Sequence, residues 1–75
     1  MVGESAGANL RELRLARGWT QEDLERRSRV SRRTIHGIEA GSVRPRAPTR
    51  KKLLAALGLE WNRQADVFGP LGPGR

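Results

Sequence analysis

Two helix-start signals lie eleven residues apart and constrain the fold of this chain more than any other feature. Thr20 is followed three residues later by Asp23, a variant of the capping box in which the threonine side chain accepts from a backbone N–H. Ser31 repeats the signal, and an apolar residue precedes each cap. These signals predict one helix over 21–28 and another over about 32–40. With so short a connection, the two helices must cross sharply, as in a helix-turn-helix.

Strand signals are nearly absent, because the chain has no Tyr and no alternating apolar run. Leucines at helical spacing, glycine stops and a proline suited to a first turn predict further helices over about 6–17, 47–57 and, as a short segment, 60–67. The expected fold is therefore all-α, a compact bundle of four to five helices.

A chain of 75 residues has room for one core, so residues 6–68 are expected to form a single domain. Residues 1–5 are expected to be flexible and the Gly- and Pro-rich segment 69–75 to be disordered. The absence of cysteine excludes disulfides and thiolate metal sites. We find no apolar run near the roughly 20 residues of a membrane span and no signal peptide, and therefore expect a cytoplasmic protein without membrane contact.

Basic residues are concentrated in the middle of the chain. Residues 26–52 hold ten Lys and Arg and one acid, Glu39, within a chain of net charge +7. Such a block favours binding to nucleic acid, the alternative being an Arg-rich solvated surface. The sequence shows no catalytic triad, no paired catalytic carboxylates, no phosphate-binding glycine loop and no metal-ligand cluster. We therefore expect neither enzymatic activity nor a metal or other cofactor.

Short motifs between Leu10 and Leu59 follow one another in a specific order and spacing. They are Leu10–Arg14, Gly18–Leu24, Val30–Ile35, Ile38–Gly41, Arg44–Pro45 and Ala56–Gly58. Together they resemble the helix-turn-helix domain of phage repressors and xenobiotic-response-element (XRE) regulators. The resemblance implies a repressor-like fold and a sequence-specific, double-stranded-DNA-binding transcriptional regulator, in the first place a repressor, encoded by a bacterium or a phage. It also implies a homodimer, which could form only on DNA.

Two other functions use the same fold. The chain could be a protein-interaction module, such as the antitoxin that binds a toxin partner, or the controller protein of a restriction–modification system.

The N-terminal residues of a helix in the major groove lie nearest the base edges. In the helix over 32–40, Arg32 and Arg33 are expected to read guanines, with His36 as a lesser reader. Either arginine could hold a phosphate instead. Gly37 either brings the helix unusually close to DNA or lacks a contact, and its cost of about 1 kcal/mol in a helix favours close approach.

Five residues are expected at phosphates. Gln21 lies at the positive N-terminus of a helix, where the resemblance also places a phosphate contact, and Thr20 could share that phosphate. Ser31 begins the next helix in the same way. Arg44 and Arg46, in the loop after the helix over 32–40, are expected to clamp the backbone further along.

The resemblance also implies a partly buried salt bridge between Arg14 and Glu39. Trp19 and Trp61 are expected in the core. The expected dimer contact consists of C-terminal apolar residues: Leu59, Trp61, Val67 and Phe68. Three residues depart from the family pattern: Glu25 in place of a small residue, Arg29 in place of a turn glycine and Arg50 in place of an apolar residue.

Overall fold

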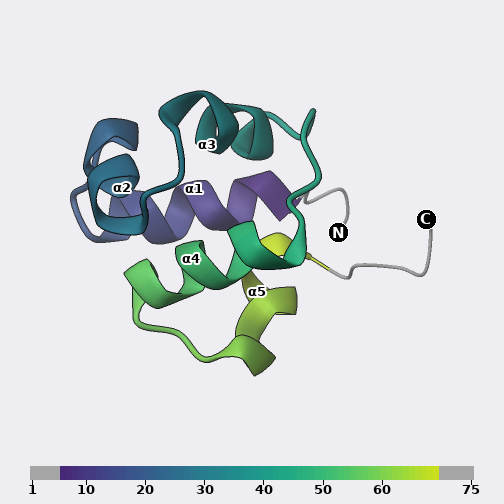
Figure 1. Ribbon diagram of the computed structural model, residues 1–75. Coiled ribbons are helices and arrows are strands. Elements are labelled where there is room, and N and C mark those ends of the chain that lie inside the picture. Colours follow the sequence, from purple (N-terminus) through teal and green to yellow (C-terminus); the bar gives the residue numbers. More distant parts are fainter. Residues whose placement is uncertain (1–5, 70–75) are drawn as a thin grey trace.

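The computed structural model describes residues 6–69, and every regular element in that range is a helix. The elements are α1 (Ala6–Ala16), α2 (Gln21–Ser28), α3 (Arg32–Glu39), α4 (Ala47–Leu57), a 3-10 helix η1 (Trp61–Arg63) and α5 (Gln64–Phe68). Figure 1 shows α1 in the middle of the molecule, with α3 above it and α4 and α5 below. The predicted all-α fold class is confirmed.

One apolar core joins all five α-helices. Each contributes at least one side chain with almost no contact with water, and the turn between α2 and α3 adds a valine. The core residues are Leu10, Leu24, Val30, Ile35, Ile38, Leu53, Leu54, Leu57, Val67 and Phe68. Helix α3 buries Ile35, Gly37 and Ile38, whereas Arg32, Arg33 and His36 are exposed and available for other contacts.

The helix bounds differ from the predicted ones at three places. Helices α2 and α4 span the predicted residues, whereas α1 and α3 each end one residue earlier. The expected helix over 60–67 is instead η1 followed by α5, which ends at Phe68. Gly69, expected in the disordered tail, is buried and donates its N–H to the Ala65 carbonyl at 2.8 Å. The expectations for residues 1–5 and 70–75 lie outside the described residues.

The C-terminal apolar residues are placed differently from the prediction. Val67 and Phe68 are 0% and 1% exposed, so they belong to the core and cannot form a dimer contact in this fold. Trp61 is 40% exposed rather than part of the core, because it lies on η1 outside the packed helices. The charged groups of Arg50 and Lys51 lie 5.4 and 5.6 Å from the centre of its ring. Trp19, in contrast, is partly buried against the core.

The turn between α2 and α3 contains a residue in the left-handed conformation. Arg29 has φ 64° and ψ 25°, and its N–H donates to the Glu25 carbonyl at 2.8 Å. A non-glycine residue there costs about 1 kcal/mol or more. The turn thus has the left-handed conformation that suits glycine, although the residue at this position is Arg29.

Among the described residues, no helix combines the length and the apolar character that crossing a bilayer requires.

Candidate nucleic-acid interface

Side chains cap the N-termini of both crossing helices. The Thr20 hydroxyl oxygen accepts from the Asp23 N–H at 3.0 Å, and the Asp23 carboxylate accepts from the Thr20 N–H at 2.8 Å. The bond that the carboxylate accepts from the Thr20 backbone is the main cause that lowers the pKa of Asp23. Ser31 accepts from the Thr34 N–H at 3.1 Å and donates its hydroxyl proton to Thr34 Oγ1 at 2.9 Å. The expected phosphate ligands Thr20 and Ser31 therefore both serve as helix caps. The hydroxyl proton of Ser31 is already used in the hydrogen bond to Thr34.

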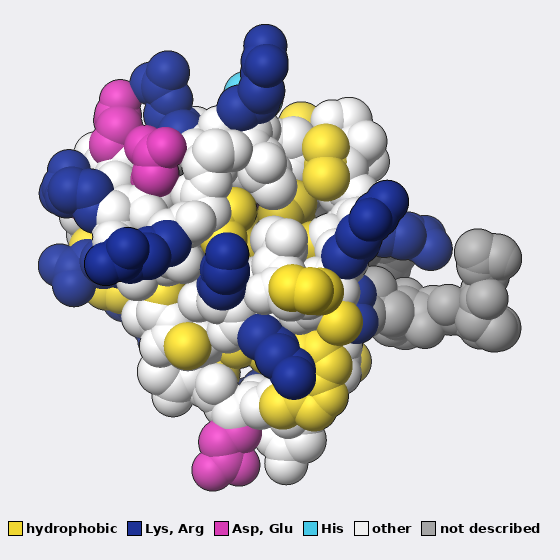
Figure 2. Space-filling model, viewed as in Figure 1, with side chains coloured by type: hydrophobic (Ala, Val, Ile, Leu, Met, Phe, Trp, Pro, Cys, Tyr) yellow, Lys and Arg dark blue, Asp and Glu magenta, His cyan; other side chains and the backbone are white. Residues whose placement is uncertain are grey.

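Helix α3 presents an exposed stripe opposite its buried isoleucines. Ile35 and Ile38 are 0% and 1% exposed, whereas Arg33, His36 and Ala40 are exposed at positions three and four residues apart. Such spacing places side chains on one helix face. Figure 2 shows Lys and Arg side chains standing out from the molecule over α3. The stripe is therefore accessible along its length, except at the one position described next.

Gly37 does not lie open on this stripe. It is buried, and a Cβ atom added to it would come within 2.4 Å of Val43 Cγ2. Packing against the following loop thus gives a reason for the glycine that needs no close approach of DNA. Contact of Gly37 with a base stays a prediction.

The loop that carries the two expected clamps is tied to the end of α3. The Gly37 carbonyl accepts from the backbone N–H groups of Ser42 and Val43 at 2.9 and 3.1 Å and from the Ser42 hydroxyl at 3.2 Å. Arg44 and Arg46 follow on this loop and are exposed. The start of the loop, Ser42 and Val43, is therefore held against α3 just before these two arginines.

Arg32 is exposed to solvent but forms an ion pair within the protein. Its Nη1 donates to Glu22 Oε2 at 2.8 Å, and both side chains are 58% exposed. Its backbone N–H donates to Glu25 Oε2 at 3.1 Å. Two carboxylates of α2 thus meet the start of α3, whereas Arg33 makes no ion pair with any acid among residues 6–69.

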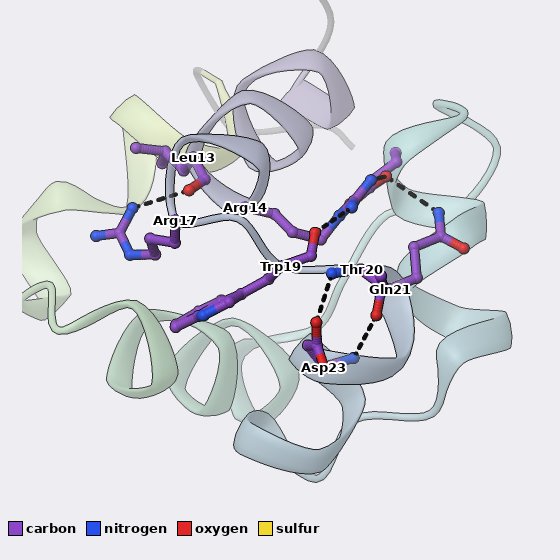
Figure 3. A network of polar contacts seen from close by, with 8 residues as sticks. Leu13, Arg14, Arg17, Trp19, Thr20, Gln21 and Asp23 are labelled. Carbon is purple, nitrogen blue, oxygen red and sulfur yellow. Dashed lines mark hydrogen bonds and ion pairs between the residues drawn. The ribbon is translucent and has the colours of Figure 1, made fainter.

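The structure contains the salt bridge expected between Arg14 and Glu39. Arg14 Nε and Nη2 donate to the two oxygens of Glu39 at 2.7 and 2.9 Å, and the side chains are only 8% and 5% exposed. Arg14 Nη1 also donates to the Trp19 carbonyl at 2.7 Å (Figure 3). The hydrogen bond to Glu39 is the main cause that raises the pKa of Arg14. This pair ties α1 to the end of α3 and to the segment before α2.

The Glu39 carboxylate also orients Gln21. Gln21 Nε2 donates to Glu39 Oε1 at 3.1 Å, so one of its two amide protons is used inside the protein (Figure 3). The other remains for a ligand. Gln21 also lines an open hollow of about 420 Å³ together with Arg32, Arg33 and His36. The structure thus brings the first residue of α2 beside the three expected readers on α3.

A model of one protein family matches most of this chain. Its description is "Helix-turn-helix", and it matches residues 10–63. The chain belongs to the helix-turn-helix family. The predicted resemblance is thereby confirmed, and the prediction of a DNA-binding transcriptional regulator is confirmed at the level of the family.

Two known proteins are similar to this helix-turn-helix chain. One is the restriction-modification controller protein C.AhdI from Aeromonas hydrophila, whose crystal structure superposes on this chain with a TM-score of 0.74. The two sequences are 35% identical, and the match covers 84% of this chain and 91% of C.AhdI. The other is multiprotein-bridging factor 1 of Schizosaccharomyces pombe, 30% identical over 71 residues. That match covers 95% of this chain but only 47% of the yeast protein, about half its length.

The three departures from the helix-turn-helix pattern are each accommodated by local contacts. Glu25 accepts the hydrogen bond from the start of α3, and Arg29 adopts the left-handed turn conformation. Arg50 donates from Nε to Gln64 Oε1 at 2.9 Å and from Nη1 to the Pro45 carbonyl at 2.7 Å. Polar partners thus replace the apolar packing expected at that position.

The roles of three side chains in this helix-turn-helix domain could not be predicted from the sequence. Glu22 pairs with Arg32 across the turn, and only its charge hinted at this. The guanidinium group of Arg27 lies over the Trp19 ring, with its Cζ 4.4 Å from the ring centre. Arg17 donates to the carbonyls of Leu13 and Leu57 at 2.9 and 2.8 Å, joining the ends of α1 and α4. No local pattern marks the last contact, because its partner is forty residues away.

Proposed function

We propose that this chain is a transcriptional regulator that binds specific double-stranded DNA sites by inserting α3 into the major groove. The observation that carries the proposal is the exposed, basic start of α3, held at a sharp crossing by the core and by the caps of α2 and α3. An α-helix fits the major groove with its N-terminal residues nearest the bases. Family membership supports the same function.

Arg33 and Arg32 are the proposed guanine readers, because a guanidinium matches guanine O6 and N7 with two hydrogen bonds. His36 lies on the same exposed stripe and acts as a lesser reader. Arg32 must leave Glu22 to reach a base. That exchange costs little, since an exposed ion pair contributes at most about 1 kcal/mol.

The phosphate contacts follow from the same placement. Gln21 and Thr20 lie at the N-terminus of α2, where the helix dipole and the remaining amide proton favour an anion. Ser31 contributes through the start of α3, and Arg44 and Arg46 hold the backbone beyond the other end of that helix. Such contacts set the position of the protein on the duplex and carry no sequence information themselves.

A symmetric homodimer on DNA is the proposed working state, because one reading helix covers too few base pairs to select a site. Of the expected contact residues, Trp61 and Leu59 still have exposed surface. Repression is the proposed mode of regulation, and control of a restriction–modification system is a specific alternative favoured by the likeness to C.AhdI. A role on DNA would place the protein in the cytoplasm or nucleoid.

A protein-interaction module is a second candidate. It is favoured by the yeast relative, which is named as a bridging factor, and by the exposed Trp61. A toxin as the partner stays a prediction. The family and the solved controller protein are typically non-enzymatic, in line with the expected absence of catalysis.

Binding to duplex DNA at increasing salt tests the proposal. The logarithm of the affinity is expected to fall with a slope of about −0.9 per neutralised phosphate against log salt. Arg44→Ala is expected to reduce that slope by about one unit. Arg63→Ala removes the same charge on η1, away from α3 (Figure 1), and is the matched control that leaves the slope unchanged. A wild-type affinity insensitive to salt refutes DNA binding through this basic surface.

A further inference from the structure

One position on the exposed stripe of α3 is covered by a residue from outside the helix. Arg33, His36 and Ala40 are exposed, whereas Gly37, which lies between them at the same helical spacing, is buried. A Cβ atom at Gly37 would lie 2.4 Å from Val43 Cγ2 and 3.2 Å from Val43 Cβ. The Val43 side chain therefore fills the space in which a side chain at position 37 would begin.

Val43 is itself open to solvent on its outer side. It is 41% exposed and is one of three large apolar residues with such exposure among the described residues. Figure 2 shows hydrophobic side-chain atoms at the surface near the loop after α3, beside projecting basic side chains. Since the Val43 N–H donates to the Gly37 carbonyl at 3.1 Å, both its backbone and its side chain are held against α3. Its methyl groups are thus presented at a defined place on the stripe.

We propose that Val43 is a specificity-determining residue that contacts the C5-methyl group of a thymine, and that Gly37 is the positioning residue that admits it. The proposal rests on the function proposed above. An aliphatic side chain makes no hydrogen bond to a base edge, and the thymine methyl is the apolar group that the major groove offers. The reading surface would then combine guanidinium groups from α3 with one aliphatic contact from the loop.

Deoxyuridine substitution tests the contact, because it removes only the methyl group of a thymine. A duplex bound by the wild-type protein is selected from a random pool, and its thymines are replaced one at a time. The wild type is expected to lose about fourfold in affinity at one thymine per half-site, the effect of one buried methyl group. Val43→Ala is expected to bind the thymine and deoxyuridine duplexes equally at that position. Equal losses for the wild type and Val43→Ala, or no loss at any thymine, overturn the proposal.

Gly37→Ala tests the positioning role. The added methyl group must displace Val43, so the variant is expected to lose both the thymine preference and affinity. The double variant Gly37→Ala, Val43→Ala relieves the closest contact and is expected to regain affinity without regaining the preference. Thermal unfolding of all variants separates this effect from loss of the fold.

The outcomes also separate this inference from the proposed function. If no duplex is enriched from the pool, sequence-specific binding fails and the thymine contact fails with it. If duplexes are enriched but Val43 does not affect the response to deoxyuridine, only the thymine contact fails.

Discussion

Replacing Glu39 by glutamine removes the negative charge at the centre of the network that joins α1, α2 and α3. The change leaves Arg14, whose side chain is only 8% exposed, without its carboxylate partner, and weakens the bond that orients Gln21. Breaking one side of a buried ion pair typically costs about 3–5 kcal/mol, because the other charge stays buried. Glutamine can still accept one hydrogen bond, so we expect a loss of about 3 kcal/mol. For a domain of this size, that corresponds to a fall in Tm of roughly 12–24 °C.

Urea and thermal unfolding followed by circular dichroism measure this loss. Glu22→Gln is the matched control, since it removes the same charge from a pair whose side chains are both 58% exposed. The control is expected to lose less than about 1 kcal/mol. A double variant, Arg14→Met with Glu39→Leu, is expected to be more stable than Glu39→Gln because it leaves no buried charge. If Glu39→Gln and Glu22→Gln lose equal stability, the buried pair does not hold these helices together.

Three further perturbations have directions that follow from the structure. Arg29→Gly removes the strain at φ 64° and is expected to raise the free energy of unfolding in urea by about 0.5–1 kcal/mol; a lower value contradicts the strain argument. The lowered pKa of Asp23 means that the stability it contributes is present above pH 3.8, its ordinary value, and is lost as the pH falls below that toward the folded-state pKa. Asp23→Asn is therefore expected to reduce the loss of stability at acid pH. An unchanged dependence of stability on pH would show that titration of Asp23 does not contribute to this loss. Glu22→Gln frees Arg32, so up to about fivefold tighter DNA binding is expected in a gel-shift titration, whereas weaker binding shows that the carboxylate helps.

The starts of the helices could be predicted from the sequence because the signals there are local. The Thr20 and Ser31 caps bond within three residues, and a proline at the start of α4 needs no distant partner. The exposed face of α3 followed in the same way from the spacing of its two isoleucines. These features suffice for the fold class and for the position of the two arginines.

The parts that could not be predicted depend on contacts between distant segments. Gly37 has the same sequence signature whether DNA or the Val43 side chain lies against it. Nothing in the sequence distinguishes the apolar residues of 59–68 from one another as core or surface residues. Packing nevertheless buries Val67 and Phe68 and leaves Trp61 exposed. Periodicity in so short a segment cannot distinguish these outcomes.

Selection of bound duplexes from a random DNA pool, performed with the wild type and with Arg33→Ala, tests the central claim most directly. The wild type is expected to enrich sites with guanine-containing half-sites. Arg33→Ala is expected to lose the guanine preference at one position of each half-site, a discrimination of about 1–3 kcal/mol, and to keep the rest of the site. No enrichment by the wild type, or the same preferences in both proteins, contradicts an α3 that reads bases through Arg33.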